Sequence, residues 1–219
     1  MQANLLELLA SSVDQLKLSI DEETCLSLLQ YVDLLISWNT KINLVSYKSL
    51  SDLIILHIVD CLIVLKAFSP SLPQAVIDIG SGAGLPGLVL KIASESSNVT
   101  LVEKNAKRAL FLKETIRIMG LKNIVVLNRD YKQLRIRPYY KGYEIVVSRA
   151  FSSRPDFFKD LTCFLKDSGS LLIMAGPSFE ENRLNLTDFS PKVCWEGTLP
   201  YSNQSRKLLS YSKTVALQD

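Results

Sequence analysis

Hydrophobic residues divide the chain into a helical first part and an alternating second part. Up to about residue 72, apolar positions recur at the three- and four-residue spacing of an amphipathic helix, beginning with Leu5, Leu8, Leu9 and Leu16. Asp21, and then Ser49 or Ser51, precede further apolar runs and carry side chains that cap helices. We therefore predict two or three helices, the second ending near Trp38 and the last near Phe68.

From Ala75 onward, short β-branched runs alternate with helical stretches. The runs are apolar nearly throughout, which is typical of strands that are buried on both faces of a parallel sheet. They cover residues 75–79, 99–102, 124–127, 145–147 and 170–174. We predict an α/β fold with a doubly wound, Rossmann-like sheet. Residues 193–195 and 208–211 are expected to add an antiparallel pair at its edge.

Length and composition fit one catalytic domain with an N-terminal cap. Of 219 residues, 47% are hydrophobic and 21% charged, which is a globular balance. We expect residues 1–72 to form a helical subdomain that packs on a larger domain over residues 73–219. The longest apolar stretch, residues 53–65, is too short to span a bilayer, and no basic residue precedes Lys17 as in a secretory signal. A cytoplasmic monomer without membrane contact is therefore expected.

Cysteine and histidine are too sparse and scattered for a metal centre. The chain has one histidine, and no C-x-x-C pair occurs among Cys25, Cys61, Cys163 and Cys194. We expect buried, reduced thiols, with neither a disulfide framework nor a metal site.

Charge is distributed unevenly along the chain. Residues 1–37 hold six acids and one base, a net charge of −5, whereas residues 104–141 hold eleven bases and two acids, a net charge of +9. This polarity indicates an anionic macromolecule as partner, nucleic acid above all. Solvated surface charge without a partner is the alternative.

A glycine-rich turn follows the first predicted strand. Residues 76–87 read VIDIGSGAGLPG, a buried strand that continues into glycines and then a helix. Glycine takes positive φ and lets a ligand approach the backbone, and the first N–H groups of the helix are free to bind it. The turn alone is ambiguous, because the spacing of its last three glycines also fits a dinucleotide fingerprint. The predicted pocket includes Gly80, Ser81, Gly82, Gly84 and Leu85.

Acidic residues near the ends of three predicted strands favour S-adenosylmethionine as the ligand. Asp78 lies two residues before the first glycine, where a carboxylate would repel a pyrophosphate but not a sulfonium cation. Glu103 ends the next strand, where its oxygens can accept both ribose hydroxyls. Asp130 follows the third strand, where an adenine edge is expected. A nicotinamide cofactor, or acids that only cap helices, are the alternatives.

Six motifs in one order resemble a known family. They are residues 38–44 (WNTKINL), 57–62 (HIVDCL), 78–87, 102–104 with 107–112 (VEK, KRALFL), 148–151 (SRAF) and 206–209 (RKLL). The chain is similar over most of its length to the glucose-inhibited division protein B family, bacterial 16S ribosomal RNA guanine-N7 methyltransferases. The resemblance implies a seven-stranded methyltransferase fold, S-adenosyl-L-methionine as donor, and 16S ribosomal RNA or the small ribosomal subunit as partner. Two positions depart from the family pattern, with Leu56 in place of a basic residue and Ala175 in place of a lysine.

Arg149 is the side chain expected to act on the acceptor. Guanine N7 carries a lone pair and no proton, so its methylation requires positioning and electrostatics rather than a general base. Arg149 follows Ser148 at the end of the fourth strand, and its guanidinium can donate to guanine O6 or to phosphate. Bonds to local carbonyls or an acid are the alternative. His57 is then expected to be structural, with Asp60 as a candidate partner.

Further contacts to cofactor and RNA are expected around these residues. The cofactor site also takes in Lys104, Arg129, Tyr131 and Arg149, and the RNA site comprises Arg108, Arg149, Phe151, Arg206, Lys207 and Asn39. Phe151 can stack on a base or belong to the core, and Asn39 can close a turn or enter the acceptor pocket. For Arg206 and Lys207, a solvated strand edge is the alternative to phosphate contact.

Two rival functions remain open at this stage. A dinucleotide-dependent oxidoreductase would need a proton donor near the sheet, and the one histidine lies outside it. A non-catalytic RNA-binding or ribosome-assembly factor could keep the same fold, although the intact glycine turn and its acids argue against this.

Overall fold

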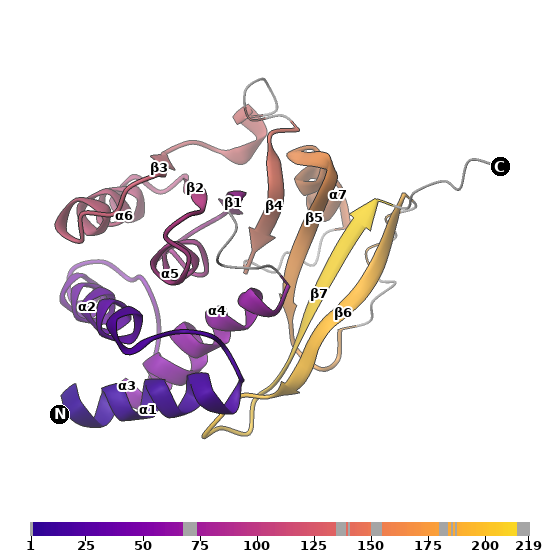
Figure 1. Cartoon of the computed structure of the whole chain (residues 1–219). Helices are drawn as coiled ribbons and strands as arrows, with labels where there is room; N and C mark the ends of the chain where they lie inside the picture. The colour runs from indigo at the N-terminus through magenta and orange to yellow at the C-terminus, as the bar shows by residue number, and fades with distance from the viewer. Residues whose placement is uncertain are drawn as a thin grey trace.

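A seven-stranded mixed sheet forms the centre of the protein, in the order β3-β2-β1-β4-β5-β7-β6 (Figure 1). The computed structural model describes residues 2–67, 74–134, 139, 141–149, 155–179, 184, 186 and 188–213. The strands are β1 (Ala75–Ile79), β2 (Asn98–Val102), β3 (Ile124–Leu127), β4 (Tyr143–Ser148), β5 (Leu165–Ala175), β6 (Phe189–Thr198) and β7 (Ser205–Lys213).

The strand pairing confirms the predicted α/β fold. Strand β1 pairs in parallel with β2 and β4, and β4 pairs in parallel with β5, whereas β7 pairs antiparallel with both β5 and β6. The antiparallel pair at the edge is therefore confirmed as well. Strand β5 begins earlier than predicted, because Leu165 pairs with Tyr143 across a register shift even though polar residues and a glycine follow it.

Three helical runs precede the sheet, as the apolar spacing predicts. Helix α1 covers Gln2–Gln15, and α2 covers Glu22–Asn39 with Asp21 as its N-cap, accepting a 2.8 Å hydrogen bond from the Thr24 N–H. The third run begins after Ser49, whose hydroxyl caps it by accepting a hydrogen bond from the Asp52 N–H. It is divided into α3 (Leu50–Leu53), a π-helical segment η1 (Ile54–Val59), α4 (Asp60–Leu62) and a 3₁₀ segment η2 (Ile63–Lys66). The wider π turn is a feature that the sequence pattern did not predict.

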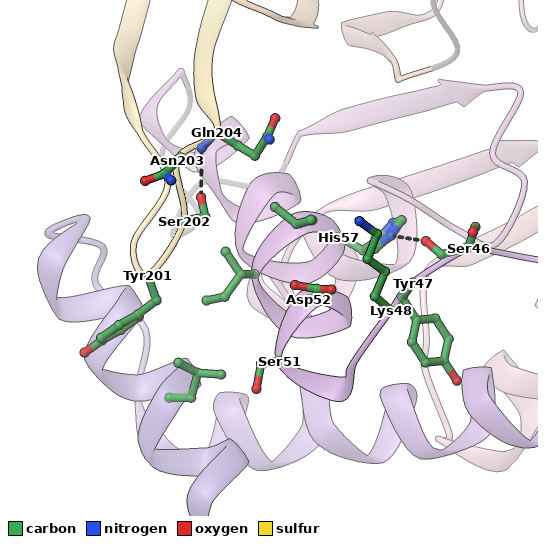
Figure 2. A pocket seen from close by; sticks show the side chains of 13 residues that line it. Ser46, Tyr47, Lys48, Ser51, Asp52, His57, Tyr201, Ser202, Asn203 and Gln204 are labelled. Carbon is green, nitrogen blue, oxygen red and sulfur yellow. Dashed lines mark hydrogen bonds between the residues drawn. The ribbon is translucent and has the colours of Figure 1, made fainter.

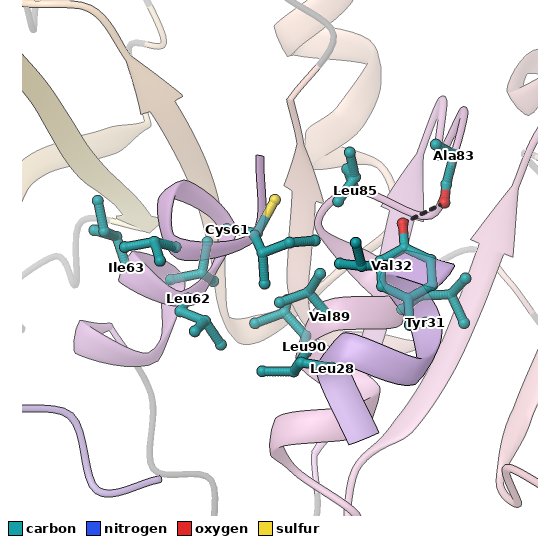
Figure 3. Close-up of a cluster of buried hydrophobic side chains, with 14 of the residues drawn as sticks. Leu28, Tyr31, Val32, Cys61, Leu62, Ile63, Ala83, Leu85, Val89 and Leu90 are labelled. Atoms are coloured by element: carbon teal, nitrogen blue, oxygen red, sulfur yellow. Dashed lines mark hydrogen bonds between the residues drawn. The ribbon is translucent and has the colours of Figure 1, made fainter. Parts of the chain in front are cut away.

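Two hydrophobic clusters cover the two faces of the sheet. On one face, the N-terminal helices pack together with α5 (Gly87–Ala93) and α6 (Ala106–Ile118) against Val76, Val99 and Val147. On the other face, α7 (Pro155–Thr162) packs through Phe158 and Leu161 against strand residues such as Ile77. Figure 3 shows side chains of α2, α4 and α5 meeting in the first cluster. The N-terminal helices thus share a core with the helix that follows the glycine turn.

The four cysteines differ in how deeply they are buried. Cys25 and Cys61 are buried free thiols as predicted, whereas Cys163 and Cys194 are only partly buried, because they lie near the sheet periphery rather than between helices. Among the residues that the structure describes, no helix combines the length and apolarity required to cross a membrane.

Candidate functional site

The glycine turn has the positive-φ backbone that its sequence predicts. Gly80, Gly82 and Gly84 have φ of 79°, 57° and 88°, values that side chains disfavour. The N–H groups of Gly80 and Ser81 both donate to the Val102 carbonyl, at 2.9 and 3.0 Å, which fixes the turn to β2. A Cβ at Gly84 would lie 2.4 Å from Leu88, whereas one at Gly82 would meet only the Gly80 carbonyl at 3.9 Å. Gly84 is therefore required by packing, and Gly82 borders open space.

A cavity of about 290 Å³ opens beside this turn, and we call it the loop cavity. It is lined by the ends of β1, β2 and β3 and by α7, through Ile79, Gly80, Val102, Glu103, Lys104, Arg108, Arg129, Asp130, Tyr131 and Phe157. The structure thus brings together seven of the predicted site residues: Gly80, Glu103, Lys104, Arg108, Arg129, Asp130 and Tyr131. The carboxyl ends of parallel strands are where α/β folds bind ligands.

Glu103 joins the turn to the start of α6. One of its carboxylate oxygens accepts a 2.9 Å hydrogen bond from the Gly82 N–H, and the other accepts a 2.7 Å bond from the Asn105 N–H. Asn105 in turn caps α6 by accepting from Lys107 and Arg108. Since a carboxylate oxygen can accept more than one hydrogen bond, Glu103 keeps acceptor capacity toward the cavity that it lines.

The far wall of the loop cavity is built by residues after β3 and by α7. Asp130 accepts a hydrogen bond from the Lys132 N–H, and the Tyr131 hydroxyl donates to Asp160 at 3.0 Å. The Tyr131 ring packs edge-to-face on Phe157 at 5.7 Å between centroids. Phe157 was not predicted, because only the folding of α7 over the sheet brings it beside Tyr131.

Asp78 lies beneath the turn rather than at the surface of the cavity. It is 0% exposed, and one of its oxygens accepts a 2.9 Å hydrogen bond from the Gly87 N–H while the other, Oδ1, has no hydrogen-bond partner among the described residues. Burial raises the pKa of Asp78 to about 7, the Gly87 and Ser81 hydrogen bonds oppose this shift, and the Glu103 charge adds to it. Asp78 is thus a buried group that supports the turn, and its part in cofactor binding stays a prediction.

Other predicted cofactor residues also lie behind the cavity wall. Ser81 is 1% exposed and donates its hydroxyl to the Asp78 carbonyl, and Leu85 is 7% exposed within the first hydrophobic cluster. Ser148 donates its hydroxyl to the Ile79 carbonyl at 2.9 Å. These three residues hold the turn and the ends of β1 and β4 in place, and Gly82 and Gly84 shape the turn itself.

Arg149 extends from the end of β4 to the third helical run. Its Nη2 donates to the Leu56 carbonyl at 2.8 Å and lies 3.4 Å from an oxygen of Asp60, and its Nη1 donates to the Cys61 sulfur at 3.7 Å. Arg149 therefore makes the local carbonyl and acid contacts that were the alternative to an acceptor role. Its side chain remains 25% exposed.

Asp60 is the acid between two arginines, and His57 is not its partner. Asp60 is 3% exposed and lies 3.4 Å from Arg149 and 3.3 Å from Arg206, a residue near the start of β7. Burial raises the pKa of Asp60, and the two arginine charges oppose that shift. His57 instead pairs through Nε2 with the Ser46 carbonyl at 3.1 Å and faces Arg149 through Nδ1 at 3.4 Å. The suggested bond between His57 and Asp60 is thus wrong, because the wide π turn directs the acid toward the strands.

The remaining predicted RNA residues are engaged within the chain or are not described. Lys207 forms an ion pair with Glu196 at 3.2 Å across β6 and β7. The Asn39 side chain closes the turn after α2, donating to the Val45 carbonyl and accepting from the N–H groups of Leu44 and Val45, so the turn-closing interpretation is the one observed. Phe151 lies outside the described residues.

A hydrogen bond that no sequence pattern predicted joins α2 to the glycine turn. The Tyr31 hydroxyl, fully buried, donates a 2.7 Å hydrogen bond to the Ala83 carbonyl (Figure 3). It supplies the partner for a buried carbonyl in the middle of the glycine turn.

Residues 24–204 match the GidB family, described as rRNA small subunit methyltransferase G. The chain belongs to this family. Among similar proteins, ribosomal RNA small subunit methyltransferase G of Francisella philomiragia is 33% identical over 91% of this chain and 93% of its own. The protein of that name from Psychrobacter arcticus is 31% identical over 95% of this chain and 84% of its own.

Solved structures share the fold of this GidB-family member at low sequence identity. A SAM-dependent methyltransferase from Aquifex aeolicus is 18% identical, with a TM-score of 0.54 over 69% of this chain and 89% of its own. M. jannaschii TYW2 in complex with AdoMet is 16% identical, with a TM-score of 0.51 over 69% of this chain and 74% of its own. The Rossmann-like methyltransferase fold that the resemblance implied is confirmed.

The two departures from the family pattern have definite places in this family member. The backbone carbonyl of Leu56 accepts a hydrogen bond from Arg149, a contact that any residue can make. Ala175 is buried at the end of β5 and lies opposite Lys207 in the β5–β7 register. Lys207 thus lies on the neighbouring strand opposite position 175, where the family usually has a lysine.

Proposed function

We propose that this protein transfers the methyl group of S-adenosylmethionine to N7 of a guanine in 16S ribosomal RNA. The acids around the glycine turn carry this proposal, since Glu103 and Asp130 line the loop cavity and Asp78 lies beneath the turn. The family to which the chain belongs and the methyltransferase fold support it. The cofactor, when bound, supplies a methyl group on a sulfonium that is open to attack by a nucleophile.

The residues of the loop cavity fit such a cofactor. Glu103 retains lone pairs for ribose hydroxyls, and the Asp130 carboxylate can accept from an adenine amino group. Asp78 is a buried acid with one unpartnered oxygen, so a positive charge above the turn would stabilise its ionised form. We propose Gly80, Glu103, Lys104, Arg129, Asp130 and Tyr131 as contacts, and Asp78, Ser81, Gly82, Gly84 and Leu85 as their support.

On the acceptor side, the residues need only orient guanine and accommodate charge. N7 attacks with its own lone pair and loses no proton, so no general base is required. We propose that Arg149, positioned by Asp60 and Ser148, donates from its exposed fraction to guanine O6 or to phosphate. Arg108, Arg206 and Lys207 are proposed to contact the RNA backbone. Phe151, which lies outside the described residues, stays a candidate for stacking on a base. Binding to RNA as a cytoplasmic monomer belongs to the same proposal.

A dinucleotide remains the chemical rival because three basic side chains also line the loop cavity. Lys104, Arg108 and Arg129 could pair with a pyrophosphate, whereas Glu103 and Asp130 would oppose it. Isothermal titration of the protein with S-adenosylhomocysteine and with NAD separates the two. Binding of S-adenosylhomocysteine and not NAD is expected, and tight NAD binding alone would overturn the proposal. Transfer of labelled methyl groups to small-subunit RNA distinguishes an enzyme from a non-catalytic RNA-binding factor.

A further inference from the structure

A second and larger cavity, of about 500 Å³, lies on the other side of Arg149. We call it the hairpin cavity, because the turn between β6 and β7 forms one rim through Tyr201, Asn203 and Gln204. Figure 2 shows this rim facing Tyr47 and Lys48 across the helix that carries Asp52. Its volume is in the range of pockets that hold drug-sized ligands.

The two cavities share no lining residue, but contacts of Arg149 and of its neighbour Ser148 link a residue of one to residues of the other. Ile79 lines the loop cavity and accepts a hydrogen bond from Ser148, the residue before Arg149. The Arg149 side chain in turn donates to the Leu56 carbonyl and faces His57, and both of these residues line the hairpin cavity. A polymer whose target base lies at Arg149 therefore has room for a neighbouring unit in the hairpin cavity.

Tyr201 is the residue in this cavity that packing alone does not explain. Its backbone has φ of 53°, in the left-handed region that disfavours a bulky side chain, and the residue is 61% exposed. Its hydroxyl is held by Ser11 of α1 at 2.6 Å. The ring is thus fixed at its tip while remaining open to solvent. An exposed aromatic ring on a strained backbone, tethered through its hydroxyl, suits stacking on a base better than it suits stability.

The charges of the cavity favour a base over an isolated phosphate. Lys48 and Asp52 both line the cavity, so it carries one charge of each sign, and burial, together with the Arg149 charge, lowers the pKa of His57, which favours its neutral form. Asn203 and Gln204 carry amides that can donate to and accept from a base edge. The Gln204 side chain also accepts a hydrogen bond from Arg206 at 3.4 Å. This bond connects the wall of the cavity to one of the two arginines that flank Asp60.

We infer that the hairpin cavity binds an unpaired nucleotide next to the target guanine, with its base stacked on Tyr201. This inference rests on the proposed function, because it assigns the RNA unit that accompanies the methylated one. Single-stranded RNA is recognised by such aromatic faces combined with hydrogen bonds to base edges. The cavity would thus contribute to substrate selection without touching the methyl donor.

Substitution of Tyr201 tests the inference. The dissociation constant for a small-subunit ribosomal RNA fragment is measured by fluorescence anisotropy, with the protein saturated by S-adenosylhomocysteine. Tyr201→Asn is expected to weaken RNA binding roughly 5- to 100-fold, the range for loss of one base stack. It should leave the S-adenosylhomocysteine constant unchanged and the melting temperature equal or higher, because asparagine tolerates the left-handed backbone.

The matched control is Tyr201→Phe, which keeps the ring and removes only the bond to Ser11. It should stay within about threefold of the wild type, since the stacking face is retained. Wild-type RNA affinity in Tyr201→Asn, or equal losses in both variants, would overturn the inference. The proposed function fails separately, if the wild-type protein binds RNA and transfers no methyl group. If the wild-type protein binds no RNA, both the proposed function and the inference about the hairpin cavity are wrong.

Discussion

The Tyr31 hydroxyl on α2 donates a 2.7 Å hydrogen bond to the Ala83 carbonyl, 52 residues further along the chain and in the middle of the glycine turn. The N-terminal helices are therefore part of the support for the loop cavity. A buried carbonyl that loses its donor has no solvent to replace it, so the Ala83 carbonyl relies on the Tyr31 phenol for its hydrogen bond.

Removal of this hydroxyl should affect both stability and donor binding. Tyr31→Phe is expected to lower the free energy of unfolding by about 1–3 kcal/mol, because it leaves the Ala83 carbonyl unsatisfied. The loosened turn should also weaken S-adenosylhomocysteine binding, measured by isothermal titration. Tyr143→Phe is the matched control, since the Tyr143 hydroxyl is also buried but donates to Thr100 within the sheet. Equal donor affinities in the two variants would remove Tyr31 from the support of the turn.

Glu103 is expected to be the principal anchor of the donor. Glu103→Ala should raise the S-adenosylhomocysteine dissociation constant roughly 10- to 100-fold, since charge-assisted hydrogen bonds of about 1.5–3 kcal/mol are lost. Glu114→Ala serves as control, because Glu114 lies on α6 outside the loop cavity and pairs with the exposed Arg117 at 2.9 Å. An unchanged constant in the Glu103 variant would reject its role toward the ribose.

The buried acid beneath the turn predicts a pH dependence that tells the two ligands apart. The pKa of Asp78 is raised to about 7, so its proton is released near neutrality. A sulfonium cation favours the ionised form, so S-adenosylmethionine should bind more tightly as pH rises from 6 to 8, whereas the uncharged thioether of S-adenosylhomocysteine should respond less. Asp78→Asn should abolish this difference. Parallel pH profiles for the two ligands in the wild type would contradict the prediction.

The same group gives the free protein the opposite trend in stability. Because the folded pKa of Asp78 lies above its ordinary value of 3.8, its contribution is fully present below that pH. It is lost as pH rises through about 7. Denaturant titrations of wild type and Asp78→Asn over this window measure the same pKa independently of any ligand.

Arg149 should govern turnover rather than donor affinity. Arg149→Lys keeps the positive charge beside Asp60 but removes the planar set of donors, so methyl transfer should fall by roughly tenfold or more. Arg206→Lys alters the other arginine of Asp60 and serves as control for the ion pair itself, with turnover measured at saturating RNA because Arg206 is also a proposed RNA contact. If both variants lose turnover equally, or if Arg149→Lys weakens S-adenosylhomocysteine binding by the same factor, Arg149 is a structural residue only.

Contact with phosphates should make RNA binding dependent on salt. The logarithm of the association constant is expected to fall linearly with the logarithm of salt concentration, by about 0.7 per phosphate contact for single strands. Arg108→Ala should reduce this slope, because Arg108, at the edge of the loop cavity, is one of the proposed contacts to the RNA backbone. Lys122→Ala should not, because Lys122 lines a separate cavity with Lys91. RNA binding that does not respond to salt would make the basic segment incidental.

Local patterns predicted the parts of this fold that depend on neighbours in the sequence. Asp21 and Ser49 cap helices through bonds to residues three positions later, and the strand β1 with its glycine turn is a continuous segment. The sequence could not predict that Asp60 would meet both Arg149 and Arg206, because three distant elements position these side chains. The π turn at residues 54–59, which directs Asp60, has no sequence signature of its own.

The same reason limits prediction of the site. The acids after successive strands identify the carboxyl edge of the sheet, so Glu103 and Asp130 could be assigned to one cavity. Whether an acid faces the cavity or the core depends on packing, and Asp78 proved to be buried against Gly87. Tyr31 and Phe157 reach the site only through tertiary contacts, and neither lies in a motif.

Analysis of the methylated nucleoside tests the central claim most directly. Purified protein is incubated with small-subunit ribosomal RNA and S-adenosylmethionine labelled in its methyl group, and the digested RNA is separated by liquid chromatography. We predict that the label appears in 7-methylguanosine, and that Glu103→Ala reduces its yield. Label in another nucleoside, or RNA left unlabelled by an intact protein that binds S-adenosylhomocysteine, would contradict the account.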